Sequence, residues 1–355
     1  MDEIRIRRRL APGIISGVGA VAALAGACSA SAQAHPAHAV GAAHAGRPAV
    51  VRVQGAQIGG FNDRPEQLMF SPDGKVLATA NSDGTARFWN VATQRQIGAP
   101  IMIPGVKIKN VAYDPNGKVL ATADTDGTVR LWNVTTHSPI GAPFAAGPRV
   151  MGVAFSPNGR LLATTSRGPI LRVWKIANHR LVASMTIPPA KYRIQMFGVT
   201  FSPDGKLLLT AESDGTARLW SLASHRQVGI LKLDRAGLVT AVFSPDGKLI
   251  GTAGGSLKNI RIWNAATGKQ VGAAMSAGQF ATLGVAFTPD SKVLVTDNAA
   301  GTIQQWSMAN HRQIRPEIVL EGYHAFQAAA LSPDGKIFAT TEIRGNARLW
   351  ILSKA

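Results

Sequence analysis

Short apolar segments separated by turn residues follow one another along most of the chain, beginning near residue 48. A typical unit starts with Val150–Phe155 and continues into Pro157-Asn158-Gly159, where Pro presets one turn dihedral and Gly accepts a positive φ. A second apolar segment such as Val76–Ala80 then precedes Asp83-Gly84, a pair typical of two-residue hairpins. The pattern predicts brief antiparallel strands joined by tight turns, and 37 Gly and 20 Pro leave little room for helices.

The same unit recurs seven times, and each copy carries one Trp. The Trp residues are spaced by 43, 42, 46, 43, 43 and 44 residues, and they are Trp89, Trp132, Trp174, Trp220, Trp263, Trp306 and Trp350. Each copy also has a Thr in a fixed position, namely Thr79, Thr122, Thr164, Thr210, Thr252, Thr296 and Thr340. A period of 40–45 residues containing several short strands is typical of the blades of a β-propeller. We expect each Trp to fill the widening outer part of a blade and its indole N–H to bond the Thr hydroxyl.

These residues resemble the WD-repeat β-propeller family over residues 48 to 355. The resemblance implies an all-β, seven-bladed propeller of four-stranded antiparallel blades, with a central channel lined by the first strand of each blade. We assign those strands to Glu66–Phe70, Ile108–Tyr113, Val150–Phe155, Gln195–Phe201, Leu238–Phe243, Thr282–Phe287 and Phe326–Leu331. The chain departs from the family because no Asp follows the Trp and no repeat has the Gly-His pair. We therefore expect the family's polar relay to shrink to Thr and Trp in most blades, with more reliance on packing.

The last repeat ends five residues after Trp350 and so lacks a fourth strand. Gln57-Ile58-Gly59-Gly60 matches Gln96-Ile97-Gly98-Ala99, which belongs to a fourth strand. We expect the N-terminal segment to pair beside the strand that ends at Trp350. This pairing would close the ring without an exposed edge.

Residues 1–34 have the features of an export signal. Arg5, Arg7, Arg8 and Arg9 precede an apolar stretch, and Ala32-Gln33-Ala34 offers a small-x-small cleavage pattern. Two alternatives stay open: lipidation at Cys28, because Leu24–Cys28 loosely resembles a lipoprotein box, and an uncleaved membrane anchor over Leu10–Cys28. Each alternative predicts an exported protein. Residues 35–47 are rich in Ala, Gly and His and are interpreted as a flexible tether.

The sequence contains none of the common catalytic motifs. Gly-x-Ser-x-Gly, His-Glu-x-x-His, a Walker loop and a Cys pair are all missing, and the single Cys rules out a disulfide within the chain. Glu66 and Lys109 stand alone in the expected channel strands, which argues against a metal or acid/base centre there. We predict no catalytic residue, no cofactor and no metal site. The alternative is a propeller enzyme or small-ligand binder acting at the top of the channel.

Four His residues recur five positions after a Trp: His137, His179, His225 and His311. Same-register recurrence is typical of a turn residue, and Gln94 and Gly268 stand at this position in two other repeats. We interpret these His residues as solvent-exposed turn residues rather than metal ligands. Six repeats also carry Arg two positions before the Trp, and we expect these side chains to pack beside the Trp.

The net charge of +18 lies almost wholly in the repeats, because residues 35–355 contain 34 Lys and Arg against 18 Asp and Glu, which leaves +16. The family resemblance places two sets of turns on one face of the ring. That face would collect Lys75, Lys118, Arg160, Lys206, Lys248, Lys292 and Lys336 together with Arg95, Arg180, Arg226, Lys269 and Arg312. Six Asp residues offset half of these twelve positive charges: Asp73, Asp114, Asp204, Asp246, Asp290 and Asp334. A solvated surface and a docking surface for anionic envelope polymer or lipid headgroups both fit this excess.

Irregular repeats offer further candidates for partner recognition. Arg167-Gly168-Pro169 replaces the Asp-Gly turn in the third repeat, and Gly254–Asn259 is longer than its counterparts. Entry loops contribute the interaction candidates Phe61, Tyr192, Arg193, Tyr323 and His324. We predict a monomeric, non-catalytic scaffold that acts outside the cytoplasm, secreted or associated with the cell envelope, and binds protein partners; nucleic acid is not expected as a partner of an exported chain.

Overall fold

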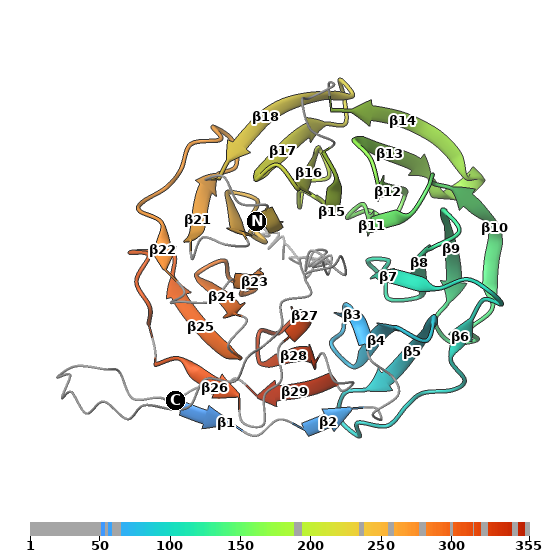
Figure 1. The fold of residues 1–355 in the computed structure, drawn as a ribbon, viewed down its shortest axis with the longest axis horizontal. Helices are drawn as coiled ribbons and strands as arrows, with labels where there is room; N and C mark the ends of the chain where they lie inside the picture. Colours follow the sequence, from blue (N-terminus) through green and yellow to red (C-terminus); the bar gives the residue numbers. More distant parts are fainter. Residues whose placement is uncertain are drawn as a thin grey trace, which may run out of the picture.

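The computed structural model describes residues 51–53, 56–58, 65–187, 194–233, 238–254, 259–276, 282–298, 301–314, 316–320, 326–342 and 347–351. Within these residues, short strands form seven separate sheets arranged in a ring around a central axis (Figure 1). Each sheet is one blade of the predicted propeller. We call its four strands inner, second, third and outer, in order of distance from the axis.

The first three blades follow one another along the chain. Blade 1 contains β3 (Pro65–Phe70), β4 (Val76–Asn81), β5 (Thr85–Asn90) and β6 (Ile101–Met102). Blade 2 contains β7 (Ile108–Tyr113), β8 (Val119–Asp124), β9 (Thr128–Asn133) and β10 (Pro139–Ala145). Blade 3 contains β11 (Val150–Phe155), β12 (Leu161–Ser166), β13 (Ile170–Lys175) and β14 (Arg180–Thr186), with the 3-10 helix η1 (Ile176–Asn178) before β14.

Blades 4 to 6 repeat this arrangement. Blade 4 contains β15 (Met196–Phe201), β16 (Leu207–Glu212), β17 (Thr216–Ser221) and β18 (Arg226–Lys232). Blade 5 contains β19 (Leu238–Phe243), β20 (Leu249–Gly254), β21 (Asn259–Asn264) and β22 (Met275–Ser276). Blade 6 contains β23 (Thr282–Phe287), β24 (Val293–Asn298), β25 (Thr302–Ser307) and β26 (Ile318–Leu320). Neighbouring strands within a blade are antiparallel because tight turns join them.

The two ends of the chain meet in blade 7, which closes the ring as predicted. Its first three strands are β27 (Phe326–Leu331), β28 (Ile337–Glu342) and β29 (Ala347–Ile351). Its outer strand is β2 (Ala56–Ile58), which pairs antiparallel with β29 and places Gln57 opposite Arg348. The side chain of Ile58 is fully buried. One feature was not predicted: β1 (Val51–Val53) lies parallel to β26 and adds a fifth strand to blade 6.

The core lies between neighbouring blades. Trp132 of blade 2 packs in one cluster with Phe88 and Ile101 of blade 1, and Trp220 of blade 4 packs with Leu171 of blade 3. All seven Trp side chains are at most 8% exposed. Because each Trp joins its own blade to the preceding one, burial of the aromatic side chains holds the ring together.

Every Trp also makes the hydrogen bond expected from the sequence. The indole Nε1 donates to the hydroxyl of the repeated Thr in all seven blades, at 2.8 to 3.0 Å. These Thr side chains are themselves buried. The bond gives a partner to a buried N–H donor that would otherwise be left without a hydrogen bond in the core.

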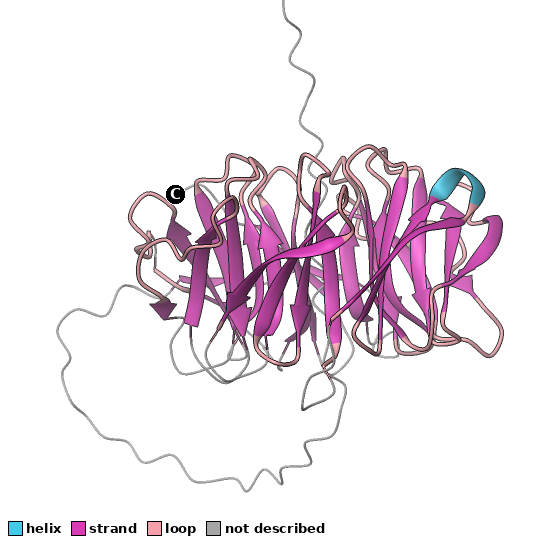
Figure 2. Cartoon of the chain, turned by 90° about the horizontal axis from the view of Figure 1, so that it is seen from above, coloured by secondary structure: helices cyan, strands magenta, loops and turns pink. Residues whose placement is uncertain are grey.

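Two sets of turns share one face of the disc, which Figure 2 shows from its edge. In blade 1 the backbone N–H of Val91, after the third strand, donates to the carbonyl of Lys75, in the turn between the inner and second strands, at 2.9 Å. Blades 2 to 6 repeat this bond. We call this side the basic turn face; the turns between second and third strands lie on the other side, which we call the opposite face.

Candidate functional site

The basic turn face carries the twelve Lys and Arg side chains singled out from the sequence, and all twelve are exposed. Seven stand in the turns between inner and second strands. The other five stand in the turns that lead into the outer strands: Arg95, Arg180, Arg226, Lys269 and Arg312. The structure therefore brings these residues together on one surface.

The Asp residues of this face are engaged by their own turns. In blade 1, Asp73 Oδ1 accepts hydrogen bonds from the Ser71 hydroxyl at 2.6 Å and the Lys75 backbone N–H at 3.1 Å. Burial works to raise the pKa of Asp73, but these hydrogen bonds outweigh it and hold the pKa below its usual value. The same arrangement recurs in blades 4, 5 and 7. The Asp residues of these four turns thus stay ionised and stabilise the turns.

The two sets of basic side chains on this face differ in their ion pairs. Lys206, Lys248 and Lys336 lie 3.5 to 3.8 Å from the Asp of their own turns, and both partners are exposed. Such exposed pairs contribute little to stability. The five basic side chains in the turns before the outer strands form no ion pair within the described part of the chain. Their charge is available to a partner.

The recurring His residues are more than exposed turn residues. His137, His179, His225 and His311 have φ values of 55 to 56°, the left-handed region, so each does occupy a tight turn. However, the His137 and His179 rings stack on Phe88 and Phe144 of the preceding blades, with ring centroids 4.5 and 4.2 Å apart. The expectation of solvent exposure holds for His225 alone, because the other three are half-buried.

On the opposite face, the Arg two positions before the Trp takes part in a polar network that was not predicted from the sequence. In blade 1, Arg87 donates to Asp83 at 2.7 Å and to Thr85 at 2.6 Å. In blade 2, Arg130 forms ion pairs with the fully buried Asp124 at 2.6 Å and with Asp126 at 2.8 Å. The Asp-Gly turns therefore bind the guanidinium groups, so these Arg side chains do more than pack beside the Trp.

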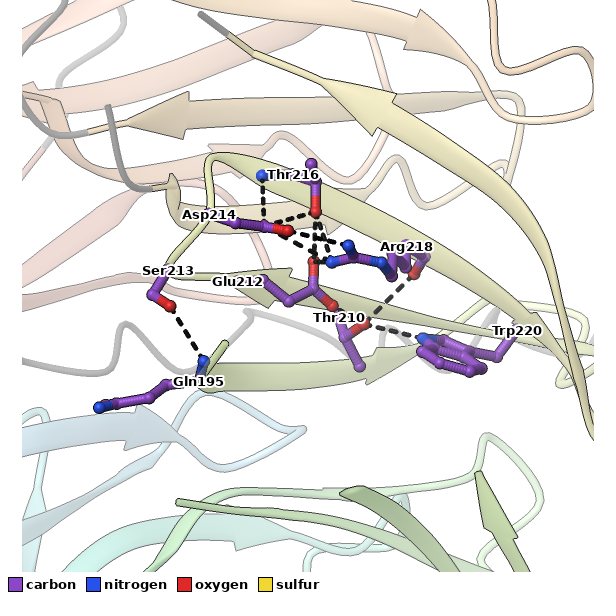
Figure 3. Close-up of polar contacts among 8 residues, drawn as sticks. All are labelled: Gln195, Thr210, Glu212, Ser213, Asp214, Thr216, Arg218 and Trp220. Carbon is purple, nitrogen blue, oxygen red and sulfur yellow. Dashed lines mark hydrogen bonds and ion pairs between the residues drawn. The ribbon is translucent and has the colours of Figure 1, made fainter. Parts of the chain in front are cut away.

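Blade 4 has the most extensive of these networks (Figure 3). The Trp220 indole donates to Thr210, and the Thr210 hydroxyl donates to Glu212, a side chain with no solvent exposure. Arg218 lies 3.3 Å from Glu212 and 2.8 Å from Asp214. The polar relay thus continues from the Trp to the turn in this blade. The expectation that the relay shrinks to Thr and Trp was made for most blades, and blade 4 is an exception to it.

Burial has a strong effect on the carboxyl groups at the ends of the second strands. It raises the pKa of Glu212 to about 8, against the hydrogen bond from Thr210 and the charge of Arg218. Burial likewise raises the pKa of Asp124 to about 7, although Arg130 opposes the shift. In blade 6, burial raises the pKa of Asp297 to about 7. Asp297 occupies space that a side chain at Gly284 would fill, because a Cβ there would lie 2.6 Å from its Oδ1.

The central channel contains a charge pair where two isolated charges were expected. Lys109 Nζ of β7 lies 2.5 Å from Glu66 Oε2 of β3, so the two inner strands are joined across neighbouring blades. The described residues include no group of three or more His, Cys, Asp or Glu side chains placed to hold a metal ion.

Several candidates lie outside the described residues. These are the export signal over 1–34 with Cys28, the tether over 35–47, and the loop residues Phe61, Tyr192, Arg193, Tyr323 and His324. Among the described residues, no helix is long and apolar enough to cross a membrane. The possible anchor over Leu10–Cys28 lies outside that part of the chain.

The ring geometry and the repeated pairing of Trp with Thr define a seven-bladed β-propeller. The family model for the WD domain, G-beta repeat, matches residues 65–90, 104–133, 142–175, 193–221 and 226–264, which lie in blades 1 to 5. The chain belongs to the WD-repeat propeller family, a fold typical of scaffolds that bind protein partners. A comparison with curated proteins finds no significant match.

Proposed function

We propose that this WD-repeat propeller is a non-catalytic scaffold that acts outside the cytoplasm and docks on an anionic lipid surface through its basic turn face. The N-terminal features of residues 1–34 support export, and the tether over 35–47 would let the propeller lie close to a membrane. The opposite face then remains open to protein partners.

The observation that carries this proposal is the arrangement of charge. Twelve exposed basic side chains and six Asp residues leave six excess positive charges on one side of the disc. Five of the basic side chains make no ion pair with described residues. Because most of the turns visible on this side of the disc reach a similar level (Figure 2), many of these charges can approach a planar surface together.

Charge reversal at the turns tests the docking. A variant with Arg95, Arg180, Arg226 and Arg312 all changed to Glu should bind vesicles that contain anionic lipid at least about tenfold more weakly, because each basic residue near such a surface contributes about 1 kcal/mol. Sedimentation with vesicles at low and high salt measures the effect. Binding of the unaltered protein should fall as salt rises, because the charges are exposed.

Two controls separate surface charge from misfolding and from net charge. Changing the same four residues to Lys keeps the charge and should keep the binding. Changing Lys107, Arg149, Arg167 and Lys232, which lie at the opposite face, to Glu lowers the net charge equally and should leave most of the vesicle binding. Equal loss from both faces, or binding only to anionic cell-wall polymer, would reject the lipid-docking proposal.

A further inference from the structure

Blade 3 breaks a rule that its two neighbours obey on the opposite face. In blade 2, the Thr125 hydroxyl accepts a hydrogen bond from the backbone N–H of Lys107, just before the inner strand, at 3.0 Å. In blade 4, Ser213 does the same for Gln195 at 2.9 Å. Arg167 occupies this position in blade 3, and a guanidinium group cannot accept a hydrogen bond. The inner strand of blade 3 therefore lacks this cap.

The backbone shows the consequence at Arg149, the residue just before β11. Its carbonyl still accepts the Arg167 N–H at 2.8 Å, but its own N–H makes no hydrogen bond to a described residue. Arg149 also has a φ of 49°, a conformation that a residue with a long side chain rarely adopts. Arg149 thus combines a missing cap with a left-handed backbone conformation, and the equivalent residues of the two neighbouring blades, Lys107 and Gln195, show neither feature. Such a local departure points to a function rather than to folding.

These departures coincide with a pocket between blades 3 and 4. Pro148, Arg149, Arg167, Gly168 and Gln195 line it. Both guanidinium groups are free of ion pairs with described residues, and none of the described residues that line the pocket is acidic. A Cβ at Gly168 would meet nothing within 4 Å, so one wall is open to an incoming chain. The pocket offers two guanidinium groups, the Gln195 side-chain amide and the Arg149 backbone N–H, which has no partner among the described residues.

We propose that this pocket binds a carboxylate side chain presented by an acidic segment of a partner protein. A carboxylate accepts hydrogen bonds without donating any, and its planar shape matches the guanidinium fork. Pro148 and the open side of Gly168 leave room for the backbone of the segment. The proposal gives the scaffold its protein-binding site and rests on the proposed function only in that respect.

A labelled nonapeptide with two adjacent glutamates between glycine and serine residues tests the site by fluorescence anisotropy. Arg167→Thr installs the residue found in blade 2, so it removes a guanidinium and restores a cap. We expect this variant to bind the peptide at least about tenfold more weakly, because a hydrogen bond to a charged group is lost. The variant should unfold at an equal or higher temperature, because the cap is restored. Arg149→Gly, which suits the positive φ, should weaken binding similarly.

Three controls decide the outcome. The matching glutamine peptide should bind much more weakly, and the fourfold Glu variant of the basic turn face should bind the glutamate peptide within about threefold of the unaltered protein. The proposal is overturned if Arg167→Thr leaves binding unchanged, if the turn-face variant loses as much, or if the unaltered protein does not bind. A phosphoserine peptide that binds at least about tenfold tighter would assign the pocket to phosphate instead. Vesicle docking can fail while peptide binding holds, so the two proposals are tested separately.

Discussion

At the scale of single residues, the hydrogen bond from Trp to Thr is the most regular interaction in the molecule. It appears in every blade, and both partners are buried. The sequence predicted this pair because both residues recur in register. Glu212 escaped prediction because its position is acidic in some repeats and Asn, Ser or Gly in others. Asp297 escaped because an acidic residue stands at its position in one repeat only.

Removing one hydroxyl should show the value of this bond. In the unaltered protein, Trp350 Nε1 lies 2.8 Å from the Thr340 hydroxyl oxygen. Thr340→Val keeps the side-chain shape but leaves the buried indole N–H without this acceptor. We expect the free energy of unfolding to fall by about 1–3 kcal/mol. Chemical denaturation measures the loss, and Thr340→Ser, which keeps the hydroxyl, should recover most of it.

The carboxyl group of Glu212 should make stability depend on pH. Its pKa of about 8 in the folded protein lies above the ordinary value of 4.5, so the folded state binds the proton more tightly. The stability from this group is therefore present below about pH 4.5 and is lost as pH rises through about 8. We expect Glu212→Gln to reduce the fall in Tm between about pH 5 and pH 8, measured by thermal unfolding.

Asp214 provides the matched control because it contacts the same Arg218. Hydrogen bonds from Arg218 and Thr216 outweigh burial and hold the pKa of Asp214 below its usual value, so its contribution is constant above about pH 5. Asp214→Asn should lower Tm by a similar amount at each pH from 5 to 8. A steeper fall in Tm for Glu212→Gln than for the unaltered protein would contradict this assignment.

At the scale of elements, the outer strand of one blade fits the turn of the next. Gly98, Gly141 and Gly272 have φ values of 63 to 69°, and each faces a His ring from the following blade. His225 has no such glycine before it and is the exposed one of the four. Strands and turns could be predicted from the repeat, whereas this fit between blades depends on three-dimensional contact.

Gly272→Ala should break one of these fits. A Cβ at residue 272 would lie 2.0 Å from His311 Nδ1, and the positive φ disfavours a side chain. We expect Tm to fall by several degrees, corresponding to about 1–3 kcal/mol. Adding His311→Gly, which suits the turn as Gly268 does in blade 5, should restore part of the loss. Independent losses from the two changes would show that the contact is unimportant.

At the scale of the whole molecule, the chain closes its ring with its own N-terminal segment. The matching Gln-Ile-Gly residues made β2 predictable, whereas β1 is three residues long and carries no repeat signal. The positions of the basic turns also followed from the sequence. The sequence also singled out Arg167 and Gly168 as part of an irregular turn, but it did not predict the pocket that they line with Arg149, because the pocket depends on the backbone conformation there.

Two truncations should separate the contributions of β1 and β2. A chain that begins at residue 54 loses β1 alone, and one that begins at residue 59 also loses β2 and the buried Ile58. We expect the second truncation to cost at least about 2 kcal/mol more, because it exposes an edge and removes a buried side chain. Equal melting temperatures for the two chains would contradict closure by β2.

The docking of one face on an anionic surface is tested most directly by photocrosslinking from each face in turn. A photoreactive residue replaces Lys206 on the basic turn face in one variant and Lys232 at the opposite face in another, both exposed positions. After irradiation with vesicles containing anionic lipid, mass spectrometry measures lipid attached to the protein. If the basic turn face docks on the vesicle, we expect lipid adducts from position 206 and few from position 232. Equal adducts from both positions, or more from position 232, would contradict it.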